Sequence, residues 1–272
     1  MSFRSSILRR MSPPNAKEVA IGRDLYLDLL KRTLLGLTLE DPSNLYPKAI
    51  GERSEVAGYD RERRVLGADW PTAAISMIGV PRMDNIRACV ESVLNDGVPG
   101  DFIETGVWRG GAVIFMRGVL KAHGVTDRPV WAADSFEGLP PPDPARFPQD
   151  AGLNLEQYKE LAVSLEQVRA NFERYGLLDE QVKFLKGWFR DTLPTAPISS
   201  LAVMRLDGDL YESTDDALRN LYPKLSPGGY VIIDDYQVPA CRAAVHDFRE
   251  SHGITDPIVA IDWAGVYWRR SR

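Results

Sequence analysis

The sequence predicts an α/β fold with a Rossmann-like sheet that is mostly parallel, has one antiparallel C-terminal strand and carries helices on both faces. A helical N-terminal extension precedes the sheet. Three observations support this fold class. From residue 101 onward, short apolar segments alternate with helical patterns, which is typical of a parallel sheet covered on both faces. Two short apolar segments near the end of the chain lie too close together for a parallel crossover. Residues 21–95 show helical spacing without this alternation.

Composition narrows the class of protein. The chain has 272 residues, of which 44% are hydrophobic and 26% charged, as in ordinary globular proteins. Its net charge of -5 argues against nucleic acid as a partner. It has no apolar run near 18 residues, so we expect no membrane span and no membrane partner. Two cysteines, Cys89 and Cys241, fit a reducing compartment, and the first ten residues lack the apolar region of a secretory signal. We therefore expect a cytoplasmic protein.

The N-terminal part divides into two expected regions. Residues 1–20 are predicted to be disordered. Residues 21–95 are predicted to form a helical cap and lid region, and residues 96–272 the catalytic domain. Two helices are indicated in the cap by apolar spacing. One has a stripe made by Leu25, Leu29, Leu30 and Leu34, and the other covers residues 81–94.

Residues 41–69 are rich in turn formers and charge, which predicts a mobile surface segment rather than a packed one. Its four residues from Arg61 to Arg64 are predicted to be a solvated face. The cap nevertheless has more apolar surface than a small cap needs. We therefore expect a homo-oligomer, a dimer or tetramer, in which this part helps to cover a neighbouring active site.

The elements after residue 100 follow in order. Strands are predicted over residues 101–105, 129–133, 182–186, 201–206 and 230–233. Helices are predicted over residues 112–121, 155–175, 213–225 and 239–252. Two last strands, 258–261 and 266–268, are separated by only a few residues including Gly265, so they form a hairpin. One antiparallel strand closing a parallel sheet is typical of class I methyltransferase-type sheets rather than of ordinary dinucleotide-binding domains.

A glycine-rich segment, Glu104-Thr-Gly-Val-Trp-Arg-Gly-Gly111, follows the first strand of the sheet. Glycine has no side chain, so the backbone there can approach a ligand closely. The spacing differs from the G-x-G-x-x-G of a pyrophosphate site. Glu104 at the strand end would repel a pyrophosphate but suits a cationic or polyhydroxyl ligand. The alternative is a turn whose glycines serve packing alone.

Asp134 ends the second strand, where a carboxylate can accept hydrogen bonds from both hydroxyls of a ribose. It follows Gly106 by 28 residues, a longer interval than the roughly 20 of dinucleotide sites. Together with Glu104 it would make a nucleoside-binding pair. The alternative role is a helix or turn cap.

Two further strands each end in a pair of acids. Because the carboxyl ends of parallel strands meet at one edge of the sheet, these acids should converge. They are Asp207, Asp209, Asp234 and Asp235. Four close carboxylates repel one another unless a cation or shared protons neutralise them. Hard oxygen ligands in this number favour Mg²⁺, and no nearby set of Cys and His residues suggests zinc.

The chain resembles the macrocin O-methyltransferase (TylF/MycF-type) family of S-adenosylmethionine-dependent sugar methyltransferases from antibiotic pathways. The resemblance covers nearly everything from about Arg23 onward. The segments that carry it are 76–79, 97–111, 133–138, 187–189, 204–211, 221–236 and 239–249. Members of the family differ in the lid regions, which here are residues 41–69 and 139–165.

The resemblance implies roles for individual residues. Mg²⁺ would be bound by Asp207, Asp234 and Asp235, and Asp209 matches the proposed general base. Contacts to S-adenosylmethionine are implied for Met77, Glu104, Thr105, Gly106, Arg109, Asp134, Ser135, Trp188, Phe189 and Asp207. Within this set, adenine is expected beside Trp188 and Phe189, and the sulfonium near Met77.

This resemblance and the acids imply one reaction. A sugar hydroxyl hardly ionises in water, so Mg²⁺ on two adjacent hydroxyls would stabilise the developing alkoxide while Asp209 takes the proton. The expected acceptor is a vicinal diol on a deoxysugar of a glycosylated, macrolide- or aminocoumarin-like natural product. Three alternatives stay open at this point. They are a catechol or phenol O-methyltransferase of the same fold, an NAD-dependent oxidoreductase, and a catalytically silent scaffold.

Overall fold

The computed structural model describes residues 14–44 and 56–271. Its centre is a sheet of seven strands in the order β6-β5-β4-β7-β8-β10-β9. The strands are β4 (Asp101–Thr105), β5 (Val130–Asp134), β6 (Val182–Lys186), β7 (Leu201–Leu206), β8 (Leu225–Ile233), β9 (Val259–Ala260) and β10 (Val266–Arg269). β4 to β8 pair in parallel, whereas β10 is antiparallel to both β8 and β9. The predicted mostly parallel sheet with one antiparallel strand near its C-terminal end is confirmed.

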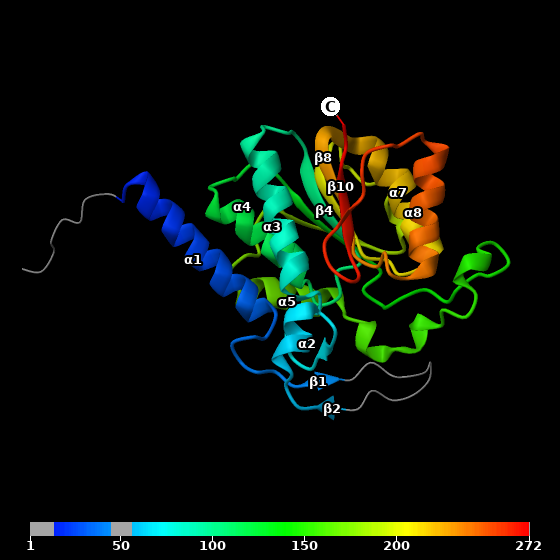
Figure 1. Ribbon diagram of the computed structural model, residues 1–272, viewed down its shortest axis with the longest axis horizontal. Coiled ribbons are helices and arrows are strands. Elements are labelled where there is room, and N and C mark those ends of the chain that lie inside the picture. Colours follow the sequence, from blue (N-terminus) through cyan, green and yellow to red (C-terminus); the bar gives the residue numbers. More distant parts are fainter. Residues whose placement is uncertain (1–13, 45–55, 272) are drawn as a thin grey trace, which may run out of the picture.

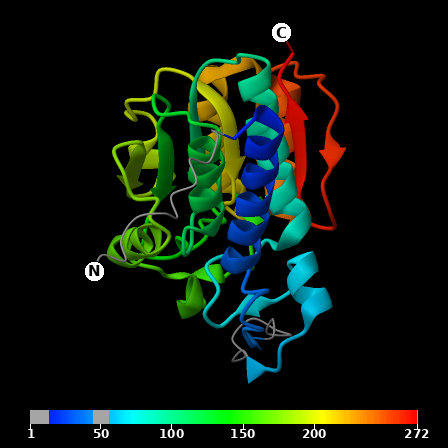
Figure 2. The same cartoon turned by 90° about the vertical axis from the view of Figure 1, so that its left-hand side faces the viewer.

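Helices cover both faces of this sheet (Figure 1). They are α1 (Ala16–Leu34), α2 (Arg61–Leu66), α3 (Gly79–Asn95), α4 (Gly111–Ala122), α5 (Leu165–Arg174), α6 (Phe189–Thr192), α7 (Tyr211–Leu221) and α8 (Pro239–Ser251). Short 3₁₀ turns are η1 (Pro148–Asp150), η2 (Leu155–Gln157), η3 (Lys159–Leu161) and η4 (Tyr222–Lys224). Figure 2 shows α1 lying along the outside of α3 and α4. No helix of the described residues is long and apolar enough to cross a membrane.

The two faces of the sheet carry two separate cores, because successive side chains of a strand point to opposite faces. On β4, Phe102 packs with α1, α3 and α4, whereas its neighbour Ile103 packs with α7 and α8. The same alternation places Val203 and Met204 of β7 in different cores. Strands buried on both faces read as continuous apolar runs, which is why the sequence showed them clearly.

Helix α1 begins earlier and faces differently than expected. The Asn15 side chain caps it by accepting a hydrogen bond from the Glu18 N–H. The Glu18 side chain in turn accepts from the Asn15 N–H, which completes a capping box. Residues 16–20 are therefore helical, contrary to the prediction of a disordered stretch over 1–20, while residues 1–13 lie outside the described part. The predicted stripe was half wrong. Leu30 and Leu34 are buried, but Leu25 and Leu29 remain 67% and 58% exposed.

Two further predictions are corrected. The helix expected over 155–175 is α5 alone, and it begins after Ser164, whose side chain accepts from the Gln167 N–H. Before it, η2 and η3 are short turns held by tertiary contacts, because Tyr158 packs edge-on against Trp70. The helix expected over 213–225 is α7, which begins at Tyr211 and gives way to η4 and then to β8.

The described ends of the segment 41–69 are packed, contrary to expectation. A small antiparallel sheet has the order β2-β1-β3, formed by β1 (Ser43–Asn44), β2 (Val56–Ala57) and β3 (Trp70–Pro71). Arg64 of α2 is fully buried rather than part of a solvated face. Its guanidinium donates to the Asp69 carboxylate at 2.8 Å and to the Asp41 carbonyl at 2.8 Å. Residues 45–55 lie outside the described part.

Candidate active site

A cavity of about 340 Å³ opens at the carboxyl edge of the central sheet. Its walls include the ends of β4, β5, β7 and β8, the start of α3, and residues of the segment 139–165. The lining residues among those predicted from the sequence are Met77, Glu104, Gly106, Asp134, Ser135, Trp188, Phe189, Asp207, Asp209, Asp234 and Asp235. The ends of parallel strands therefore meet at one edge, as the sequence predicted.

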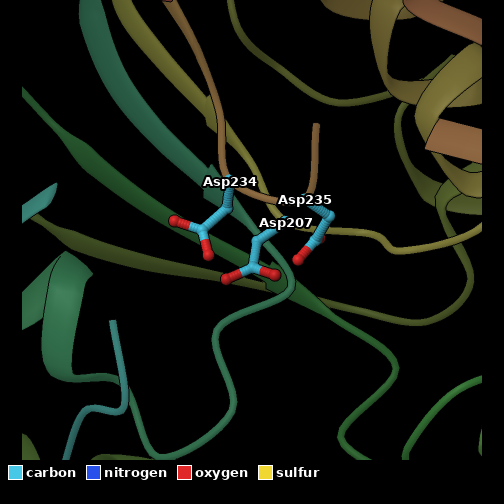
Figure 3. A group of neighbouring side chains, drawn as sticks. All are labelled: Asp207, Asp234 and Asp235. Atoms are coloured by element: carbon cyan, nitrogen blue, oxygen red, sulfur yellow. The ribbon is translucent and has the colours of Figure 1, made fainter. Parts of the chain in front are cut away.

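Three carboxylates of the cavity wall lie close together (Figure 3). Asp207 follows β7, and Asp234 and Asp235 follow β8. One oxygen of each lies within 4.8 Å of the others. Such a set of hard oxygen ligands fits Mg²⁺, with water or substrate oxygens able to complete the shell. The donor set is therefore suited to the ion that the sequence predicted.

Asp209 lies beside this group in an unusual backbone conformation. Its φ is 55°, and its N–H donates to an Asp235 carboxylate oxygen at 3.0 Å. Asn and Asp tolerate this left-handed conformation better than most residues. Burial, followed by the charges of Asp207 and Asp234, raises the pKa of Asp209 to about 7. A carboxyl with this pKa can accept a proton near neutral pH.

Two buried arginines hold the acids, and neither was predicted as a site residue. Arg205 of β7 is hydrogen-bonded to Glu104 and to Asp234, and its Nη2 lies 2.9 Å from an oxygen of Asp207. Arg82 of α3 donates from Nη1 to the other oxygen of Asp234 at 2.5 Å. One signal in the sequence pointed to Arg205. A charged residue inside an otherwise apolar central strand needs a buried partner.

The three carboxyl groups differ in the direction in which their surroundings shift the pKa. Burial alone would raise the pKa of Asp234, but Arg205 and Arg82 overcome this effect and lower it. Burial and then Asp234 raise the pKa of Asp207, and burial and then Asp207 raise that of Asp235. Asp234 is thus held as a carboxylate. The negative charges around Asp207 and Asp235 disfavour ionisation of these two groups, and a divalent cation would offset this repulsion.

The predicted ligands for the methyl donor lie around the cavity. Glu104 uses one oxygen for Arg205, and its Oε2 is buried without a hydrogen-bond partner among the described residues. That oxygen fits an ammonium group of a ligand. Both Asp134 oxygens accept backbone N–H bonds at 2.7 Å, from Phe136 and from Val107. Asp134 therefore caps the turn, as the alternative interpretation of the sequence predicted. It also lines the cavity, where a ribose could reach it.

Two predicted cofactor contacts are not brought to the cavity wall. Thr105 is fully buried, and its hydroxyl has no hydrogen-bond partner among the described residues. The Arg109 guanidinium instead donates to the carbonyls of Pro71 and Ala74, at 3.2 and 2.8 Å. Arg109 thereby ties the glycine-rich loop to the N-terminal part, which sequence spacing could not show.

Packing explains why position 106 is a glycine. A Cβ at this position would lie 1.7 Å from the carbonyl oxygen of Asp207. The glycine therefore lets the loops after β4 and β7 approach each other, and this approach places Asp207 in the cavity.

The segment 139–165 borders the cavity through Leu139, Pro140, Leu155, Tyr158 and Leu161. The indole N–H of Trp108 donates to the carbonyl of Glu160 at 2.8 Å, and Asp150 caps α7. These contacts fix the segment to both sides of the cavity. Its role as a lid stays a prediction.

Comparison with known proteins agrees with the fold. The solved structure of the O-methyltransferase NovP superposes with a TM-score of 0.85 and 54% identity, and the match covers 92% of this chain and all of that one. The calicheamicin methyltransferase CalS11 shares the fold with a TM-score of 0.56 and 20% identity, over 99% of this chain and 98% of that one. The sheet, the cavity at its carboxyl edge and these neighbours define a class I methyltransferase.

The model of the family "Macrocin-O-methyltransferase (TylF)" matches residues 23–270, and the chain belongs to this family. A tetracenomycin 4'-O-methyltransferase of Streptomyces olivaceus, named for a dimethoxy-rhamnosyl substrate, is 59% identical, with 92% of this chain and 94% of that one covered. Mycinamicin III 3''-O-methyltransferase of Micromonospora griseorubida is 56% identical, with 92% and 98% covered.

The demethyldecarbamoylnovobiocin O-methyltransferase of Streptomyces niveus is 53% identical, with 94% of this chain and 97% of that one covered. The chain is therefore an S-adenosylmethionine-dependent O-methyltransferase, as the resemblance implied. The alternatives of an NAD-dependent oxidoreductase and of a silent scaffold are wrong.

Proposed function

We propose that this enzyme methylates one hydroxyl of a vicinal diol on a deoxysugar of a glycosylated natural product, with Mg²⁺ at Asp207, Asp234 and Asp235. The observation that carries the proposal is the place of Asp209 beside these three carboxylates. The names of the relatives support a glycosylated acceptor, since one of them is named for a rhamnosyl substrate.

In the proposed methyl transfer, different residues of this chain would bind the donor and accept the proton. When bound, S-adenosylmethionine supplies an electrophilic methyl group, and Mg²⁺ supplies charge stabilisation for a hydroxyl that loses its proton. Asp209 accepts that proton, the acceptor oxygen takes the methyl group, and S-adenosylhomocysteine is the second product. Glu104 would hold the ammonium group of the donor, and Asp134 its ribose. Trp188 and Phe189 would flank the adenine.

Binding of the donor product tests the first part of this proposal. Isothermal titration with S-adenosylhomocysteine, with and without Mg²⁺, is expected to show binding to the wild type that weakens at least about tenfold in Asp134→Ala. Asp134→Asn, which keeps one acceptor oxygen for the turn, should bind between these two. Equal affinity in all three proteins would remove the ribose role of Asp134.

Acceptor trials test the second part. A glycoside with a vicinal diol should be methylated, its monodeoxy analogue should not, and EDTA should stop the reaction until Mg²⁺ is restored. The catechol or phenol alternative predicts the opposite preference. A phenol ionises more easily, so Asp209→Asn would keep most of its activity on catechol. That pair of results would replace the sugar acceptor with a phenolic one.

We also propose that the chain forms a homo-oligomer through α1. Ile21, Leu25 and Leu29 are spaced four residues apart on one face of this helix and are at least 50% exposed. A second copy offers the same apolar stripe, so the two faces match each other. Light scattering should give a dimer or tetramer for the wild type and a smaller species for Leu25→Glu/Leu29→Glu. A monomeric wild type would contradict the proposal. The expected cytoplasmic location stays a prediction.

A further inference from the structure

Arg82 connects the acidic group to two distant parts of the chain. It is 5% exposed, and each of its three nitrogens donates a hydrogen bond. Nη1 donates to Asp234 at 2.5 Å, Nε to Asp262 in the β9–β10 turn at 3.0 Å, and Nη2 to the carbonyl of Gly67 at 3.2 Å. Asp234 and Asp262 both form ion pairs with this guanidinium. Burial lowers the pKa of Arg82, but these two carboxylates outweigh it and raise the pKa, so the side chain stays charged.

Asp234 does not depend on Arg82 for its orientation. Its second oxygen is hydrogen-bonded to Arg205, which also reaches Glu104 and Asp207. Loss of Arg82 would therefore leave Asp234 held from the other side. What Arg82 adds is a positive charge beside the Asp234 carboxylate, which would be one of the three metal ligands. Like charges at this separation repel strongly in a buried site.

Asp262 acts on the same charge from outside the acidic group. Its Oδ2 accepts from Arg82, while its Oδ1 accepts from the N–H groups of Ala264 and Gly265 at 2.9 and 2.8 Å. An asparagine here can keep one oxygen for both N–H groups, but its NH2 group cannot accept from Arg82, so the negative charge and the hydrogen bond to Arg82 Nε are both lost. Asp262→Asn thus changes the electrostatics of Arg82 while the turn keeps its hydrogen bonds.

We propose that the positive charge of Arg82 lowers the metal affinity of the Asp207–Asp234–Asp235 site, and that Asp262 raises this affinity by neutralising part of the Arg82 charge. The inference rests on the metal site proposed above. Trp263 and Gly67, which contact Arg82, also line the cavity. The wall of the cavity and the metal site are therefore joined through one side chain.

The test measures Mn²⁺ affinity of the full chain, without donor or acceptor, from the electron paramagnetic resonance signal of free Mn²⁺. Arg82→Gln should bind Mn²⁺ about tenfold more tightly than the wild type. Asp262→Asn should bind it several-fold more weakly. Arg82→Lys keeps the charge and should stay within about twofold of the wild type. A merely structural role would lower the melting temperature of these variants and leave their Mn²⁺ affinities alike.

Two control variants separate this inference from the metal site itself. Arg87 lies on the same helix, and Arg87→Gln removes ion pairs with Glu91 and Asp24. None of these three residues lines the cavity, so the Mn²⁺ affinity of this variant should equal that of the wild type. Asp235→Asn should lose Mn²⁺ binding, which reports on the metal site alone.

The outcomes are distinct. If the wild type binds Mn²⁺ and Asp235→Asn does not, equal affinities in Arg82→Gln and Asp262→Asn overturn the inference and leave the metal site standing. Changes of the same sign in these two variants also overturn it. If the wild type binds no Mn²⁺, the metal site and the inference are both wrong. If Arg82→Gln fails to fold, Asp262→Asn decides, and an unchanged or tighter affinity there contradicts the proposal.

Discussion

The carboxylate of Asp150 accepts a hydrogen bond from the backbone N–H of Tyr211 at 2.6 Å, and its other oxygen accepts from the next N–H of α7 at 3.1 Å. Helix α7 has no capping side chain of its own, because Leu210 precedes it. A residue of the segment 139–165 thus caps the helix that follows Asp209. Asp150 thereby links the segment 139–165 to the start of α7, two residues after Asp209.

Asp150→Ala should lower the free energy of unfolding by about 1–2 kcal/mol, since it leaves one partly buried and one buried N–H group of α7 without their acceptor. Urea denaturation measures this change. Asp143→Ala is the matched control, because Asp143 accepts only a long bond in an exposed turn and should lose less than about 0.5 kcal/mol. Equal losses in the two variants would contradict the capping role.

Asp209→Asn should lower kcat by about 10²–10⁴-fold, because it removes the proton acceptor. Asparagine tolerates the positive φ of this position, so the backbone should keep its conformation. Affinities for S-adenosylhomocysteine and for Mn²⁺ are expected to stay within about twofold of the wild type. Methylation assays and titrations measure the two effects, and an undiminished kcat on a glycoside would remove Asp209 as the base.

Arg64→Met should lower the free energy of unfolding by about 3–5 kcal/mol. In the wild type Arg64 donates hydrogen bonds to the buried Asp69 carboxylate and to the carbonyls of Leu35 and Asp41. Methionine removes all of these donors. Arg61→Met, at an exposed position of the same helix, should change it by less than about 0.5 kcal/mol. Urea denaturation of both variants measures the difference, and similar values would show that the buried pair contributes little.

Asp216 gives a pH-dependent prediction. Burial, then the charges of Glu212 and Asp215, raise its pKa to about 6, above the roughly 3.9 of an unfolded chain. The folded state therefore favours the protonated form, and this contribution to stability is present below about pH 4 and is lost as the pH rises through about 6.

Asp216→Asn should accordingly melt at the wild-type temperature at pH 4 and about 2–4 °C higher at pH 8. This corresponds to about 1 kcal/mol after allowance for partial exposure. Thermal melts at the two pH values measure it. The exposed Asp127→Asn serves as the control and should show no such rise between the two pH values. A rise of equal size at pH 4 would point to a cause other than titration.

The prediction that the four aspartates converge came from local pattern. Asp207 and Asp209 follow one apolar strand, and Asp234 and Asp235 follow the next. In a parallel sheet the position of a residue along its strand also fixes the edge of the sheet on which it lies. Their meeting at one edge could therefore be predicted without knowing any contact.

The partners of the arginines could not be predicted in this way. Arg82 and Asp234 are 152 residues apart, and no periodicity relates them. Arg64 lies in a charged tetrad that is typical of solvated helices, yet it is buried because Asp69 and the nearby carbonyls surround it. Burial of a charge is decided by partners that only the folded chain supplies.

The glycine-rich loop shows both kinds of information. The sequence alone determined that a turn with close backbone approach follows β4, because glycine at a strand end has few other uses. Only the tertiary structure decided that Gly106 makes room for the Asp207 carbonyl and that Arg109 points to Pro71 and Ala74.

The same division holds for the whole chain. The alternation of strands and helices, the antiparallel closure and the edge that holds the acids follow from hydrophobic period and loop length, which are properties of neighbouring residues. Which face of α1 is buried, which acids are held by arginine and which loop residues line the cavity depend on groups far apart in the sequence. Packing brings those groups together, and a pattern of neighbours does not contain that information.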